Sequence, residues 1–163
     1  MAGHKYKYAE KHIAGLPIYV LMFGINVEGD WYRNIYGISY NMETIEKMIS
    51  DLGPMPSGWE EGDYYVVKAG QLRKELYQTF FELKEPIDGE CYIVATGGAS
   101  DMIEEYQGVF KDRQTAFDYA TGVMSFEEIN PDAIYVMKAT VDEIAPEGGF
   151  DVESLEGLME EMY

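Results

Sequence analysis

Two short apolar segments, each closed by a glycine, recur 73 residues apart and constrain the fold of this chain more than any other feature. They cover residues 18–24 and 91–97. Their length, their β-branched and aromatic residues and the closing glycine are typical of buried strands. A polar turn and a second strand are expected after each of them, with the second strands ending at residues 36–39 and 107–110.

A helix is expected to follow the second strand in both halves. Asn41 and Asp112 lie 71 residues apart, and a short side-chain oxygen at such a position can accept a hydrogen bond from the first helical turn. Apolar residues follow each cap at spacings of three and four; they are Met42, Ile45, Met48 and Ile49 in the first half and Ala116, Phe117, Tyr119 and Ala120 in the second. A loop (residues 53–62 or 121–132) and a third strand (64–69 or 134–139) complete each half.

The expected strands and helices predict an α+β fold. Their matched positions lie 73, 71 and 70 residues apart, which indicates a repeat. We expect two tandem ββαβ units from an internal duplication, with antiparallel or mixed sheets that share one core or pack closely together, because a lone unit of this size buries little surface. A chance likeness of two α+β segments is the alternative. The expected divisions are a basic N-terminal arm (1–15), the first unit with its linker (16–84), the strongly acidic second unit (85–145) and an acidic C-terminal helix (146–163). Residues 71–85 fit a helix or a strand equally well.

The C-terminal segment is expected to form a short helix that Asp151 caps. One face is apolar, and the other carries carboxylates; the apolar residues are Val152, Leu155, Leu158, Met159 and Met162, and the acidic ones Glu153, Glu156, Glu160 and Glu161. Carboxylates late in a helix oppose its dipole. This helix therefore needs packing or a partner to be stable.

The charge of the chain is large and unevenly placed. The net charge is −18; residues 1–84 have 9 Lys+Arg against 11 Asp+Glu, and residues 85–163 have 3 against 19. The halves thus carry −2 and −16. Such a field repels nucleic acid and anionic membranes and attracts basic surfaces. No direct contact with nucleic acid or membrane is expected.

Cysteine usage and hydropathy bear on the compartment. Cys91 is the only cysteine, residues 1–15 contain no apolar run, and no stretch approaches the ~20 apolar residues that span a bilayer. These features predict a soluble, cytoplasmic protein.

No motif predicts a catalytic, metal or cofactor site. His4 and His12, the only histidines, lie in the basic arm without further ligands at metal-binding spacings. Cys91 lies in a predicted strand and is expected to be an inert buried thiol. The paired carboxylates are too numerous to indicate acid–base chemistry. We therefore expect a protein that is not an enzyme and holds no cofactor.

The candidate partner-binding residues are acidic, with one aromatic. Trp59, Glu60 and Glu61 lie in a Pro/Gly-rich loop, where a tryptophan rimmed by charge can anchor an interface. The alternative is that Trp59 folds back over its own sheet. In the second half, Glu104, Glu105, Glu127 and Glu128 would be held at fixed spacing by the predicted ββαβ frame.

In charge, size and lack of catalytic motifs, the chain resembles the acidic antirestriction and anti-CRISPR inhibitors of phages and mobile elements. The resemblance rests on no sequence motif, so it assigns no residues. It implies a nucleic-acid mimic that occupies the basic surface of a DNA- or RNA-binding defence enzyme, since duplex DNA presents closely spaced negative charges. The alternatives are a protein–protein adaptor whose acidity is a solubilising face, and an enzyme with an unrecognised carboxylate site.

Overall fold

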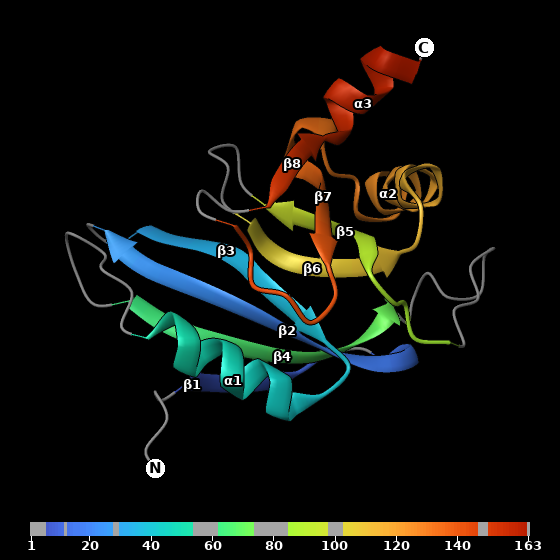
Figure 1. Cartoon of the computed structure of the whole chain (residues 1–163). Coiled ribbons are helices and arrows are strands. Elements are labelled where there is room, and N and C mark those ends of the chain that lie inside the picture. The colour runs from blue at the N-terminus through green and yellow to red at the C-terminus, as the bar shows by residue number, and fades with distance from the viewer. Residues whose placement is uncertain are drawn as a thin grey trace.

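The structure is a computed structural model that describes residues 6–11, 13–27, 30–53, 62–73, 85–97, 103–146 and 150–162. At 25–27, 30–33, 62–63, 103–104 and 162 only the backbone is described. The fold is mixed α+β: one curled sheet, antiparallel except for its first strand, and three α-helices among the described residues. The strand order is β3-β2-β4-β6-β5-β7-β8, with β1 paired to β4 (Figure 1).

The first half contains β2 (Ala14–Val27), β3 (Asp30–Ser39), α1 (Met42–Leu52) and β4 (Gly62–Leu72). Strands β3 and β4 flank β2 and are both antiparallel to it. The Asn41 side chain caps α1 by accepting a hydrogen bond from the amide of Glu43 at 2.8 Å. The predicted elements of this half are therefore present, in the predicted order.

The second half contains β5 (Glu90–Gly97), β6 (Ile103–Phe110), α2 (Arg113–Glu127), a 3₁₀ turn η2 (Pro131–Ala133) and β7 (Ile134–Thr140). Strands β6 and β7 flank β5, so the strand order matches that of the first half. The Asp112 side chain caps α2 by accepting from the amide of Thr115 at 2.8 Å. Helix α2 continues past Thr121, where a loop was expected, because Val123 remains buried in the core. It ends at Glu127, and the capping residue Glu128 has a left-handed φ of 54°.

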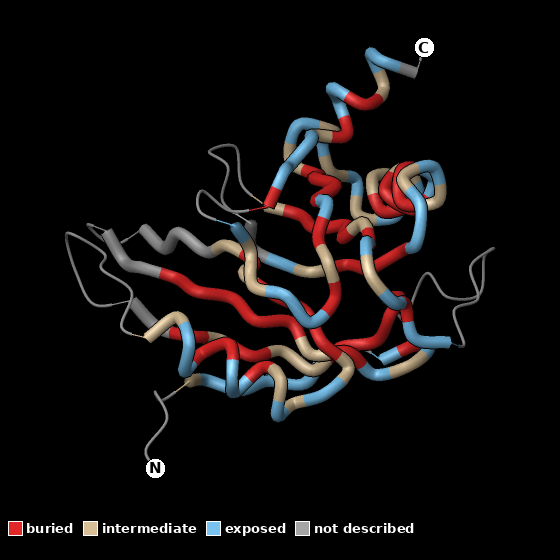
Figure 2. The backbone as a smooth tube through the Cα atoms, viewed as in Figure 1, coloured by how far each residue is buried: buried red, intermediate tan, exposed pale blue. Residues whose placement is uncertain are grey.

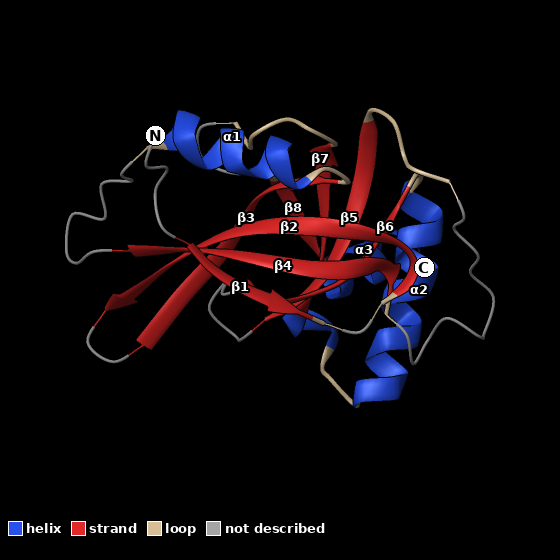
Figure 3. Ribbon diagram, turned by 90° about the horizontal axis from the view of Figure 1, so that it is seen from below, coloured by secondary structure: helices blue, strands red, loops and turns tan. Residues whose placement is uncertain are grey.

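The two halves join where Leu72 of β4 pairs with Gly108 of β6. On the other side, the segment after β7 bonds to β3: the amide of Asp142 donates to the carbonyl of Ile38, and that of Ala145 to the carbonyl of Tyr36. These contacts fold the sheet back on itself. Figure 3 shows α1 and α2 on different sides of the folded sheet.

Alternate residues of each central strand face different cores, as the period of two requires. Ile18 and Val20 of β2 pack with Ile93 of β5 in a core shared by both halves. Leu21 on the opposite face of β2 packs under α1, and Val94 of β5 packs under α2. The expected shared core is thus confirmed, and the buried residues run through the middle of both halves in Figure 2.

Strand β1 (Tyr6–Glu10) lies in the segment expected to be a basic arm. It pairs in parallel with β4, and the Lys7 ammonium lies 5.4 Å from the ring centroid of Tyr65. The chain then crosses β4 at Gly70, where an added Cβ would lie 2.3 Å from the backbone nitrogen of Ala14. The sequence did not indicate this strand, because its residues alternate in no apolar pattern and four of the five are exposed.

The C-terminal helix exists, but it begins later than expected. Asp151 does not cap it: residues Asp151–Ser154 form strand β8, antiparallel to β7, and α3 spans Leu155–Met162. The hydroxyl of Ser154 accepts a hydrogen bond from the amide of Gly157 and takes the capping role. Leu155 and Leu158 pack into the core under α2, which supplies the tertiary support that the helix was expected to need.

The predicted linker falls mostly outside the described residues. The predicted linker begins with the last residues of β4, and residues 74–84 lie outside the described part, so the choice between helix and strand there is untested.

None of the helices found in the described residues is both long and apolar enough to traverse a bilayer.

Candidate functional site

The predicted partner-binding residues are placed in different surroundings. Trp59, Glu60 and Glu61 lie outside the described residues. Glu104 lies in β6 at an irregularity where Thr96 pairs with Glu105 and Gly97 with Ile103; its side chain is not described.

The other three predicted carboxylates lie near the end of α2 or on β6. Glu105 and Glu128 are exposed, and Glu127 is half-buried. Glu127 forms an ion pair with Arg73, which follows β4. The predicted acidic cluster therefore has a cation within it, which the sequence did not reveal because Arg73 lies 54 residues from Glu127.

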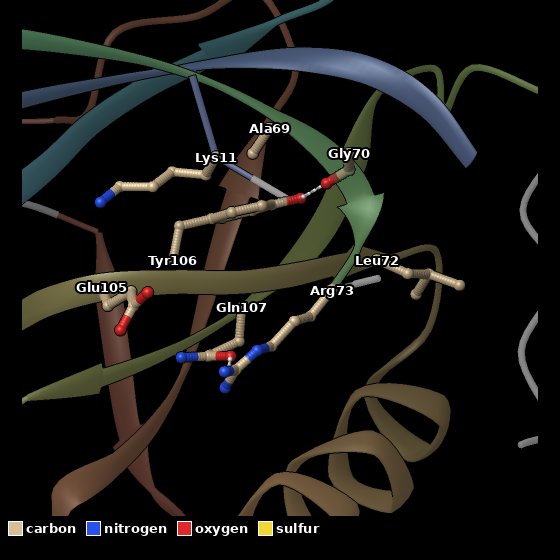
Figure 4. A pocket seen from close by; sticks show the side chains of 8 residues that line it. All are labelled: Lys11, Ala69, Gly70, Leu72, Arg73, Glu105, Tyr106 and Gln107. Carbon is tan, nitrogen blue, oxygen red and sulfur yellow. Dashed lines mark hydrogen bonds between the residues drawn. The ribbon is translucent and has the colours of Figure 1, made fainter. Parts of the chain in front are cut away.

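A small pocket lies at the seam between β4 and β6 (Figure 4). The Tyr106 hydroxyl donates to the carbonyl of Gly70 at 2.9 Å, and its burial raises the pKa of Tyr106 well above the ordinary value. Across the pocket, the Arg73 guanidinium donates to the side-chain oxygen of Gln107 at 3.3 Å. Lys11 and Glu105 line the same pocket.

The seam is built mainly for structure. The Tyr119 hydroxyl accepts from the amide of Arg73 at 2.8 Å and donates to the carbonyl of Gln107 at 2.9 Å, so one side chain of α2 bonds to both strands. The guanidinium of Arg73 also lies 5.4 Å from the ring centroid of Phe126. The pocket volume is about 20 Å³, room for about one water molecule. The pocket thus has charges of both signs in its lining, from Lys11, Arg73 and Glu105.

A second candidate surface, the acidic tail surface, is formed by exposed carboxylates of β8 and α3. No basic residue follows Lys138 in the chain. Every acidic residue of these two elements is exposed, whereas their leucines are buried. The acidic tail surface consists of Asp151, Glu153, Glu156, Glu160 and Glu161.

Arg113, in the first turn of α2, forms ion pairs with one carboxylate of β8 and one of α3. Its guanidinium lies 2.7 Å from the Glu153 carboxylate and 2.9 Å from that of Glu161. Hydrogen bonds and the positive charge of Arg113 lower the pKa of Glu161. Glu156 and Glu160 form no ion pair with any described residue, so no described cation offsets their charge at close range.

Two observations bear on the chemistry of the described residues. Among the described residues, no group of three His, Cys, Asp or Glu side chains could hold a metal ion. Cys91 is buried in the shared core, and burial raises its pKa to about 12, so the thiol is a poor nucleophile near neutral pH.

Comparison with known proteins identifies no relatives of this chain: no protein-family model, curated protein or solved structure matches it significantly.

Proposed function

We propose that this protein is a non-enzymatic binding protein that docks on a basic protein surface through its acidic tail surface. The observation that carries the proposal is the pairing pattern of the carboxylates. The carboxylates near the seam lie close to the cations Arg73 and Lys11. Glu156 and Glu160 on α3, by contrast, form no ion pair with a described residue. A partner with clustered Lys and Arg would supply those charges and gain long-range attraction.

The docked position of α3 supports this choice of surface. Its leucines pack under α2 and Arg113 fixes Glu153 and Glu161, so the carboxylates are held on a framework before a partner arrives. Pre-ordered side chains lose less conformational entropy on binding. The surface preferred from the sequence, Glu104, Glu105, Glu127 and Glu128, stays a prediction that variants can test.

In its sharpest form, the proposal is that the carboxylates imitate nucleic-acid phosphates and inhibit a DNA- or RNA-binding defence enzyme. Two observations support this form. Residues 85–163 carry a net charge of −16, and the tail carboxylates lie on β8, which pairs with β7, and on α3, which follows β8 directly. Such an inhibitor would act in the cytoplasm, which suits a chain whose single cysteine, Cys91, is a buried thiol.

The adaptor function is the second candidate. Carboxylates also lie on the exposed face of α1, at Glu43, Glu46 and Asp51, far along the chain from the tail. Acidic residues spread over several faces favour a solubilising role. In that case, binding would depend on other residues and only weakly on salt.

A direct experiment uses a panel of purified restriction and CRISPR nucleases with immobilised protein. We expect capture of a nuclease at 0.1 M salt, much weaker capture at 0.5 M, and displacement by duplex DNA. Capture that duplex DNA does not displace favours the adaptor over the mimic. Salt-independent capture, or tight binding of the protein itself to DNA in a gel-shift assay, contradicts the proposal.

We also propose that the two halves arose by duplication. Both have the central strand flanked in the same order. An added Cβ on Gly37 would meet Met48 of α1, and one on Gly108 would meet Tyr119 of α2; both glycines and both helix residues are 71 positions apart. A matched helix-to-glycine contact is what two copies of one unit would retain.

A further inference from the structure

A hollow of about 250 Å³ opens beside the acidic tail surface and is lined by residues of β5, β7, β8 and the first turn of α2. Three of its residues lie on neighbouring strands and in register: Tyr92 of β5 pairs with Lys138 of β7, which pairs with Asp151 of β8. Cross-strand partners present their side chains on the same face of a sheet. Val136 and Glu153 form the next row, and Arg113 also lines the hollow.

The charges around the hollow leave an excess of negative charge. The two cations already have carboxylate partners: Lys138 lies 3.6 Å from Glu90, and Arg113 binds Glu153 and Glu161. Asp151 forms no ion pair with the described residues. The lining holds two cations and two carboxylates, and the carboxylates of Glu90 and Glu161, which pair with those cations from outside the lining, bring the local sum to −2. The surroundings of the hollow therefore favour a positive guest.

Its shape favours one kind of cation. Tyr92, half-buried, offers an aromatic ring, and Val136 an apolar surface. A guanidinium is planar, stacks on aromatic rings and is more weakly hydrated than an ammonium, and it can donate two parallel hydrogen bonds to a carboxylate such as Asp151. Lysine lacks this planar fork.

We propose that this hollow is an anchor site for an arginine side chain of the basic partner, with Asp151 binding the guanidinium and Tyr92 contacting its plane. The inference rests on the proposed function, since it locates one residue of the partner beside the acidic tail surface. The tail carboxylates would guide the partner, and the hollow would fix its register.

The test uses a short probe, acetyl-Gly-Arg-Gly-amide, titrated into the full-length protein and followed by NMR. The matched probe contains citrulline, which has the shape of arginine without its charge. We expect saturable shifts at the Tyr92 ring and the Val136 methyl groups with arginine and at least fivefold weaker binding of citrulline. Asp151→Asn should weaken arginine binding at least fivefold, and the control Glu46→Gln, on the exposed face of α1, less than twofold.

Lys138→Gln supplies a change of opposite sign, which misfolding cannot mimic. Removing this cation should tighten arginine binding, because it lessens repulsion and leaves Glu90 unpaired. Equal effects of Asp151→Asn and Glu46→Gln, shifts confined to α3, or no gain with Lys138→Gln would overturn the arginine site. The proposed function fails separately, if no basic protein binds the acidic tail surface at all.

Discussion

The hydroxyl of Tyr119 accepts a hydrogen bond from the backbone amide of Arg73 at 2.8 Å, which ties helix α2 to the end of β4 in the other half of the chain. The same hydroxyl donates to the carbonyl of Gln107 in β6. Because Tyr119 is 1% exposed, water cannot replace either bond without opening the seam. This side chain therefore couples the stability of the two halves.

Tyr119→Phe should destabilise the protein by about 1–3 kcal/mol, because the buried amide of Arg73 loses its acceptor. Urea unfolding monitored by tryptophan fluorescence gives this value. The control is Tyr92→Phe, since the Tyr92 hydroxyl makes no hydrogen bond with the described residues, and it should change the stability by less than about 0.5 kcal/mol. Equal stabilities of the two variants would contradict the role of Tyr119.

Three glycine-to-alanine changes should order themselves by what the new Cβ meets. At Gly70 it would lie 2.3 Å from the Ala14 backbone, so we expect a loss of more than about 3 kcal/mol. At Gly37 it meets the sulfur of Met48 at 2.6 Å, a flexible group that can move, and about 1 kcal/mol is expected.

At Gly122, in α2, nothing lies within 4 Å, and alanine should stabilise by about 0.5–1 kcal/mol through its helix propensity. The same urea series measures all three variants. A larger loss for Gly37→Ala than for Gly70→Ala would show that the crossing of β4 at Gly70 is wrong.

The outline of the fold was predictable because local signals carried it. Asn41 and Asp112 identified the helix starts, and the apolar segments identified the central strands. Strand β8 was missed because Asp151–Ser154 show no alternation of buried and exposed residues, and the strand depends on pairing with β7, a segment distant in sequence. Glu127 was among the predicted residues, but its ion pair with Arg73 was missed for the same reason: the pair exists only when the two halves fold together.

The docking of α3 should depend on pH through Glu161. Hydrogen bonds from Arg113 lower the pKa of Glu161 below its ordinary value of 4.5. A lowered carboxyl pKa in the folded state contributes stability that is fully present above pH 4.5 and is lost as the pH falls through the lowered value. The methyl resonances of Leu155 and Leu158 should therefore report loosening of α3 on acidification below pH 4.5.

Arg113→Gln should remove this pH-dependent step and leave α3 looser at neutral pH, with faster amide exchange. Glu156→Gln is the matched control, because Glu156 has no ion pair with a described residue and the step should survive. If α3 loosens on acidification to the same extent in Arg113→Gln, the pH dependence arises from other carboxylates and not from Glu161.

Cys91 should report on opening of the shared core. Burial raises the pKa of its thiol to about 12, so at pH 8 the folded protein should react with a disulfide reagent at least a hundredfold more slowly than in 8 M urea. Above the ordinary thiol pKa of 9, the unfolded state releases this proton more readily, so stability should fall as the pH rises from 9 towards 12. Rapid labelling of the folded protein would contradict the burial of Cys91.

Charge reversal at two matched pairs of exposed residues tests the central claim most directly. Glu156→Lys with Glu160→Lys alters the acidic tail surface, and Glu46→Lys with Asp51→Lys makes the same change of charge on α1. Affinity for the captured basic protein is measured at 0.1 M salt, with thermal unfolding as the folding control. We expect the tail variant to bind at least 100-fold more weakly, about 2.8 kcal/mol, and the α1 variant to bind within about threefold of the unaltered protein. Equal losses in both variants, or no loss in either, would contradict docking through the acidic tail surface.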